Sequence, residues 1–96
     1  MSTESLLISE TAKWLKKAEI EFSKTKPADK NHLAGARSLP TAPLAVGKGE
    51  EFIKNIAAYI DDSMHFTQKK DHVRAFEAII WAWAWIEIGK DIGVLK

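Results

Sequence analysis

Cysteine is absent from the 96 residues of this chain, which excludes disulfide bonds, thiolate catalysis and cysteine-ligated metal sites. An excess of charge of either sign is also absent, because 14 basic residues oppose 13 acidic ones and the net charge is +1. No global field therefore gathers nucleic acid or anionic lipid, and any such binding has to depend on a local patch.

Long hydrophobic runs are missing as well. The longest unbroken apolar run spans residues 78–86, or nine residues, whereas a helix needs roughly 20 to cross a bilayer. The first seven residues carry Glu4 and lack the basic lead of a secretory signal. Together with the missing cysteines, these features predict a cytoplasmic protein without a membrane span.

Proline and glycine are scarce outside one stretch, residues 26–48, which contains Pro27, Pro40, Pro43, Gly35 and Gly47. These residues interrupt any long helix, so we expect a connecting loop. The loop is longer than usual and includes apolar residues between Leu33 and Val46, which are able to lie against the rest of the fold.

Helical periodicity marks three segments, at about residues 3–25, 49–68 and 72–92. The stripe of the first consists of Ile8, Thr11, Leu15, Ala18 and Phe22, and that of the second of Phe52, Ile53, Ile56, Tyr59, Ile60 and Ser63 or Met64. Ser2 or Thr3 and Asp71 are suitable N-caps, and Gly93 is a suitable C′ residue. We therefore expect an all-α fold, an antiparallel three-helix bundle that forms a single domain over residues 1–96.

The third helical segment is apolar on two sides. Val73, Phe76, Ile79, Ile80 and Trp83 project in one direction, which we expect to face the core, and Trp81, Trp85, Ile88 and Ile92 project nearly opposite. A strand is the alternative, because tryptophan alternates with alanine over residues 81–85. No second segment is suited to pair with such a strand, and alanine favours helix.

Trp81 and Trp85 together form a patch that is large for a monomer to leave uncovered. The loop between Leu33 and Val46, or the other two helices, could cover the patch from within the chain. Another chain could also cover it, most simply an identical copy related by a twofold axis. We therefore take Trp81, Trp85, Ile88 and Ile92 as a candidate interaction surface.

The last 40 or so residues carry a family resemblance, through Tyr59, Asp62, Phe66, Asp71, Val73, Arg74, Ala75, Phe76, Trp81, Ala82, Trp85, Gly89, Gly93 and Leu95. In these residues the chain resembles an archaeal family, the domain of unknown function family 357. The resemblance implies a short helical protein that forms a three-helix bundle, without an established activity. Lys70 stands where the family pattern has a turn glycine.

Metal-binding residue types gather around the predicted turn between the second and third helices: Asp61, Asp62, His65, His72 and Glu77. A carboxylate and a histidine three or four residues apart share a helix face, as in di-metal bundles. Such dinuclear sites draw ligands from four helices, whereas only two contribute here, so we predict neither a metal nor a cofactor. We interpret Asp62 and Arg74 as a structural pair that bridges the turn.

The chain has no glycine-rich phosphate loop, nucleophile elbow or zinc-protease motif, so we do not expect an enzyme. We expect a protein-interaction or structural module whose third helix self-associates, with a dimer as the simplest product. Binding to nucleic acid or a ribonucleoprotein is the alternative, through Lys13, Lys16, Lys17, Lys24 and Lys26, or through Lys69, Lys70 and Arg74. A small-molecule pocket lined by tryptophans is the third hypothesis.

Overall fold

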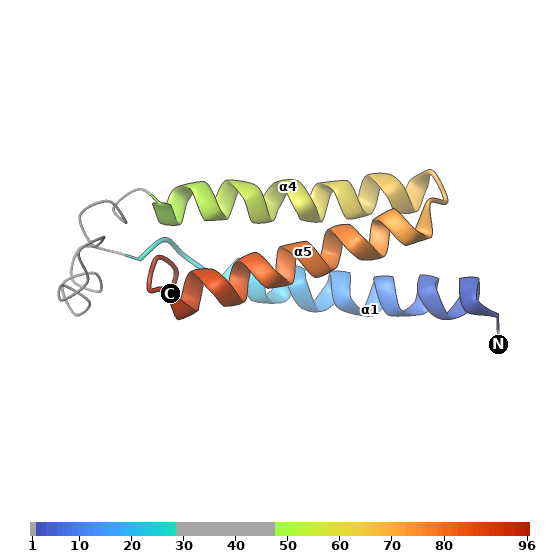
Figure 1. Cartoon of the computed structure of the whole chain (residues 1–96), viewed down its shortest axis with the longest axis horizontal. Helices are drawn as coiled ribbons and strands as arrows, with labels where there is room; N and C mark the ends of the chain where they lie inside the picture. Colours follow the sequence, from blue (N-terminus) through green and yellow to red (C-terminus); the bar gives the residue numbers. More distant parts are fainter. Residues whose placement is uncertain (1, 29–47) are drawn as a thin grey trace.

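Three helices form the part of the chain that the computed structural model describes, residues 2–28 and 48–96 (Figure 1). They are α1 (Thr3–Lys24), α4 (Lys48–Gln68) and α5 (His72–Asp91). Each end lies within one residue of the predicted position, and α4 runs antiparallel to both α1 and α5. The all-α bundle predicted from the sequence is confirmed. None of the described helices combines the length and hydropathy needed to span a membrane.

Two of the predicted N-caps begin their helices. The hydroxyl oxygen of Ser2 accepts a hydrogen bond from the backbone N–H of Ser5 at 3.0 Å. The carboxylate of Asp71 accepts one from the N–H of Arg74 at 3.2 Å. Each bond satisfies a donor that the first helical turn leaves free, which typically stabilises a helix by about 1 kcal/mol.

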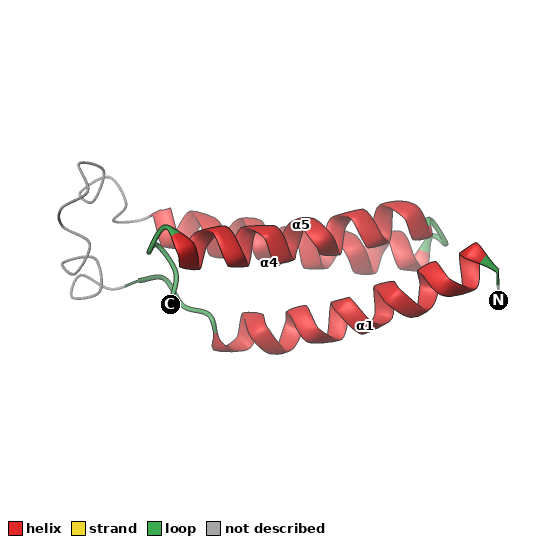
Figure 2. Cartoon of the chain, turned by 60° about the horizontal axis from the view of Figure 1, so that its bottom comes forward, coloured by secondary structure: helices red, strands yellow, loops and turns green. Residues whose placement is uncertain are grey.

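The core lies around α5, which lies between the other two helices in Figure 1 and packs against both, whereas α1 and α4 contact each other much less. In Figure 2, α5 overlaps α4 and α1 lies below them. The residues that α5 buries are mostly small: Ala75, Ala78, Ala82 and Gly89, together with Ile79 and Ile86. Of these, Ile79, Ala82 and Ile86 belong to one apolar cluster with Ala18 of α1 and the isoleucines at 56 and 60 of α4. Small side chains on the central helix let both neighbours approach it closely.

The rotation of α5 differs from the prediction. Val73 and Ile80, which we expected in the core, are 67% and 42% exposed, and Phe76 and Trp83 are half-buried. Of the predicted core stripe, only Ile79 is fully buried. The face that carries Ala75, Ala78 and Ala82, together with Ile79 and Ile86, occupies the centre of the bundle, and its alanines allow the neighbouring helices to approach closely. Similarly, Ile8 of the predicted α1 stripe is exposed.

Ser63 is a polar residue in the apolar stripe of α4, and it is fully buried. Its hydroxyl donates a hydrogen bond to the carbonyl oxygen of Ala75 at 2.8 Å, which joins α4 to α5 one turn from the connection between them. The bond offsets the cost of burying the hydroxyl. Met64, the alternative member of that stripe, is exposed.

The C-terminal residues fold back onto the end of α5 and then pair with the segment that leaves α1. Gly93 has a φ of +84°, and the N–H groups of Val94 and Leu95 donate to the carbonyl oxygen of Gly89 at 2.9 and 3.0 Å. Lys96 then exchanges two backbone hydrogen bonds with Lys26, both 2.9 Å. This C-terminal tail, residues 94–96, buries the side chain of Leu95 against the bundle.

Most of the predicted loop 26–48, from residue 29 to residue 47, lies outside the described residues. Packing of Leu33 to Val46 over Trp81 and Trp85 is therefore also outside them. Residues 26–28 are described, and they form the antiparallel pairing with the C-terminal tail, including the bridge between Pro27 and Leu95.

Replacement of Gly89 by alanine is expected to destabilise the fold by about 1 to 3 kcal/mol. A Cβ atom at this position would lie 2.9 Å from Cδ2 of Phe52 and 2.7 Å from Cγ of Leu95, and both side chains are buried. Urea denaturation followed by circular dichroism measures the change. Asp91→Ala, an exposed change two residues away, serves as the control and should stay within about 0.5 kcal/mol of the wild type.

Lys70→Gly is expected to stabilise the protein by about 1 kcal/mol. Lys70 has a φ of 62°, a left-handed conformation that costs a residue with a side chain about 1 to 2 kcal/mol and that glycine adopts freely. Lys70→Ala removes the same charge but keeps the strained backbone, so it should give no comparable gain. Equal stabilisation by the two substitutions in thermal unfolding would assign the effect to charge and contradict the prediction.

Candidate interaction surface

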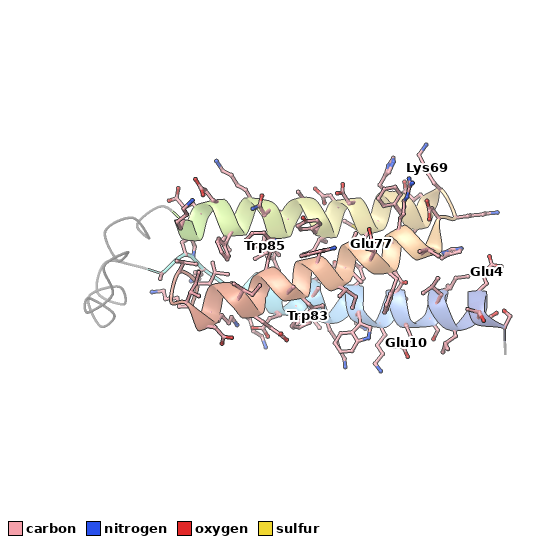
Figure 3. All side chains as sticks on the ribbon, in the orientation of Figure 1. Glu4, Glu10, Lys69, Glu77, Trp83 and Trp85 are labelled. Carbon is pink, nitrogen blue, oxygen red and sulfur yellow. The ribbon has the colours of Figure 1, made fainter. Side chains whose placement is uncertain are left out.

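The three tryptophans of α5 leave the helix on two sides because successive residues turn by 100°. Trp81 and Trp85 lean toward α4, where Trp81 stacks on Tyr59 with ring centroids 6.3 Å apart. Trp83 leans toward α1 (Figure 3). Its ring meets that of Trp14 edge to face, with the ring centroids 6.0 Å apart. The predicted divergence of the indole rings is therefore observed, although both directions are flanks of the core.

The predicted interaction surface is exposed at three of its four residues. Trp81, Ile88 and Ile92 are 51%, 47% and 52% exposed. Trp85 is half-buried, and its ring meets that of Phe52 edge to face with the centroids 4.7 Å apart. We define the α5 apolar face as Trp81, Ile88 and Ile92, with Trp85 at the boundary between this face and the core.

The indole nitrogen of Trp85 is buried without a hydrogen-bond partner in the described part of the chain. A buried N–H that lacks an acceptor costs about 1 to 3 kcal/mol relative to a paired one. The indoles of Trp14 and Trp83 differ, since the first donates to the Glu10 carboxylate at 3.1 Å and the second to the Trp14 carbonyl at 3.2 Å. Trp85 therefore buries the apolar surface of its ring, but its N–H group gives up the hydrogen bond that it would make with water.

The predicted structural pair of Asp62 and Arg74 is not formed. The guanidinium of Arg74 lies 3.6 Å from the carboxylate of Asp71, three residues before it, and 5.8 Å from the ring centroid of Phe66. Asp62 is exposed on α4. Arg74 pairs with Asp71 because the capping hydrogen bond already holds the Asp71 carboxylate beside Arg74. Forming the ion pair therefore costs little additional side-chain entropy.

The residues considered for metal binding do not converge. Asp61, Asp62, His65 and Glu77 are exposed, and His72 lies 3.8 Å from Glu4 of α1 through its Nε2 atom. Within residues 2–28 and 48–96, no three histidine or carboxylate side chains are placed to share a metal ion. A shallow hollow of about 520 Å³ adjoins this end of the bundle, with Glu4, Lys69 and His72 among its lining residues.

The lysines of α1 are partly engaged within the chain. The ammonium groups of Lys17 and Lys13 lie 4.7 and 5.7 Å from the ring centroid of Trp14. On the same side of the helix, Glu21 accepts a hydrogen bond from Lys90 of α5. That hydrogen bond and the positive charge of Lys90 hold the pKa of the Glu21 carboxyl below its ordinary value.

The charges that flank the α5 apolar face differ between its two ends. Lys69, Lys70 and Arg74 lie where α5 begins, together with Asp71 and Glu77, and Asp91 lies exposed near its C-terminal end. Lys90 is also at that end, but it pairs with Glu21 toward α1. The face therefore has a small excess of basic groups where α5 begins and an acidic group at its C-terminal end. This difference was not predicted, because the two lysine clusters had been interpreted only as nucleic-acid sites.

Comparison with known proteins agrees with the resemblance found in the sequence. The family model described as "Protein of unknown function (DUF357)" matches residues 11–95, a longer stretch than the 40 residues that first indicated it. The crystal structure of protein AF1782 from Archaeoglobus fulgidus, also assigned to DUF357, is similar with a TM-score of 0.75 and 39% sequence identity. The alignment covers 99% of this chain and 97% of that one.

Functionally curated proteins yield no match at a significant level. The extent of the family match and the identity to the Archaeoglobus protein are nevertheless sufficient to assign the family. The chain belongs to the DUF357 family.

Proposed function

We propose that this chain is a protein-interaction module that self-associates through the α5 apolar face. The observation that carries the proposal is the exposure of Trp81, Ile88 and Ile92, which are each about half accessible on one side of one helix. Clustered apolar side chains on a surface mark interaction sites more often than isolated ones do.

The area of this face indicates a weak association. A helix of 20 residues is about 30 Å long and 10 Å wide, so α5 alone offers roughly 300 Å², against about 800 Å² per partner in a standard interface. Burying the remaining half of each apolar side chain contributes about 1 kcal/mol. We therefore expect dissociation constants in the micromolar range or weaker, with adjoining residues of α4 completing the contact.

A second copy of the chain suits this face because of its charges. In an antiparallel arrangement about a twofold axis, the basic end at Arg74 of each copy meets the acidic end at Asp91 of the other. Both pairs of ends are then complementary at once, whereas a parallel arrangement juxtaposes like charges. Such an isologous contact closes on itself and gives a dimer.

Nucleic-acid binding by α1 has less support. Lys13 and Lys17 lie over the ring of Trp14, so their ammonium groups are partly engaged within the chain. An exposed aromatic platform for bases does not accompany these lysines in the described residues, since Trp14 itself is half-buried.

Trp81→Glu is expected to abolish self-association, because it places a charge in the centre of the proposed contact. Sedimentation equilibrium from 10 to 500 μM, on the order of the expected dissociation constant, would show concentration-dependent mass for the wild type and monomer mass for the variant. Ile20→Glu is the matched control, since Ile20 is 50% exposed but lies on α1. The proposal fails if both variants retain the wild-type mass profile, or if the wild type is monomeric throughout.

Exchange of charge between the ends of α5 tests the antiparallel arrangement. Arg74→Glu or Asp91→Arg alone should weaken the dimer roughly two- to thirtyfold, because each removes two symmetry-related attractions of about 0.2 to 1 kcal/mol. The double variant, which reverses both ends, should recover most of the affinity. Additive weakening in the double variant would exclude the antiparallel pairing, even if Trp81 proves essential.

A further inference from the structure

A second apolar feature lies on the other flank of α5, between this helix and α1. It is a hollow of about 310 Å³ lined by Trp14 of α1 and by Ile80, Trp83, Ala84 and Glu87 of α5. The four α5 residues follow each other at positions i, i+3, i+4 and i+7, so they share one face of the helix. Ala84 leaves room between larger neighbours.

The two indole rings of the hollow are held in place by their own N–H groups. Trp14 donates to Glu10, and Trp83 donates across the helix interface to the backbone of Trp14. The ring planes stand at 84° to each other. A ligand therefore meets two fixed, nearly perpendicular aromatic surfaces and does not have to supply acceptors for them, which reduces the entropic cost of binding.

The carboxylate of Glu87 determines which ligand fits. Glu87 is exposed, and within the described part of the chain it has no ion-pair partner, since Lys90 pairs with Glu21. Lys13 and Lys17 lie over the Trp14 ring but do not line the hollow. Glu10, which is bonded to Trp14, offsets part of their charge. One unpaired acid thus stands beside an aromatic and aliphatic wall.

We propose that this hollow binds an alkylammonium group. The alkyl stem would lie against Ile80 and Ala84, the ammonium group would interact with the carboxylate of Glu87, and the indole ring of Trp83 would add cation–π attraction. Lysine side chains and free aliphatic amines both carry this chemistry. The proposal is independent of self-association, because the α5 apolar face lies on the side of the helix toward α4.

The four tryptophans provide an internal control, because two of them line the hollow and two do not. In a ¹⁵N-labelled sample each indole N–H gives its own NMR signal, so titration with butylammonium chloride should move the signals of Trp14 and Trp83 along a saturable curve. The signals of Trp81 and Trp85 should remain in place. We expect millimolar affinity, consistent with about −4 kcal/mol for one small contact. 1-Butanol, the uncharged analogue, and potassium chloride at equal ionic strength are the ligand controls.

Glu87→Gln should weaken butylammonium binding about two- to fivefold, to the level of 1-butanol, while it leaves 1-butanol binding unchanged. Glu77→Gln is the matched control, an exposed glutamate of the same helix that does not line the hollow, and it should have no effect. Equal affinity for butylammonium and 1-butanol in the wild type would overturn the proposal, as would an unchanged preference in the Glu87 variant or shifts shared by all four indoles.

Two further experiments distinguish a lysine side chain from a free amine as the ligand, and ligand binding in the hollow from self-association. N-acetyl-lysine methylamide should bind as tightly as butylammonium if the site accepts a lysine within a protein, and more weakly if it accepts only free amines. Either result supports an ammonium site, and absence of binding by both ligands rejects it. Repetition in the Trp81→Glu variant shows whether the response persists without self-association. Loss of the response there would tie the hollow to the dimer and refute the independent site.

Discussion

Close approach of α1 and α4 to a central helix with small side chains is the constraint on which the rest of this structure depends. Ala75, Ala78, Ala82 and Gly89 let the neighbouring helices approach the buried side of α5, where Ile79 and Ile86 are its only large buried side chains in the described part of the chain. The three indole rings of α5 cannot occupy that surface without separating the helices. They therefore lie on its flanks, where each meets an aromatic ring of a neighbouring helix.

This displacement creates both surfaces for which a role is proposed. On the flank toward α4, Trp81 stacks on Tyr59 but keeps half of its area accessible. On the flank toward α1, Trp83 closes only one side of the space beside Trp14 and leaves a hollow. A larger residue in place of Ala82 would push the neighbouring helices away from α5. The indole rings of α5 would then no longer lie at the flanks toward α4 and α1.

The helices could be predicted from the sequence because their signals are local. Polar and apolar residues alternate with helical period in α1 and α4, and Ser2 and Asp71 mark starts that the structure confirms. The rotation of α5 could not be predicted in the same way, since a helix that is apolar nearly all round gives little contrast between its faces. The spacing of its small residues at 75, 78, 82 and 89 was the signal that could have identified the buried face.

The ion pair between Arg74 and Asp71 was also not predicted. Asp71 caps α5 and at the same time pairs with the Arg74 side chain, and the sequence pattern indicated only the cap. The bridge between Pro27 and Leu95 joins residues too far apart in sequence for any local pattern to indicate it.

The pairing of residues 94–96 with the segment that follows α1 joins two stretches that are far apart in sequence, since Lys26 and Lys96 differ by 70 positions. Closing a loop of that length has an entropic cost, which packing of α1 against α5 offsets by holding the two segments near each other. Loosening of the contact between these two helices is therefore expected to separate the paired backbone before the helices themselves unfold.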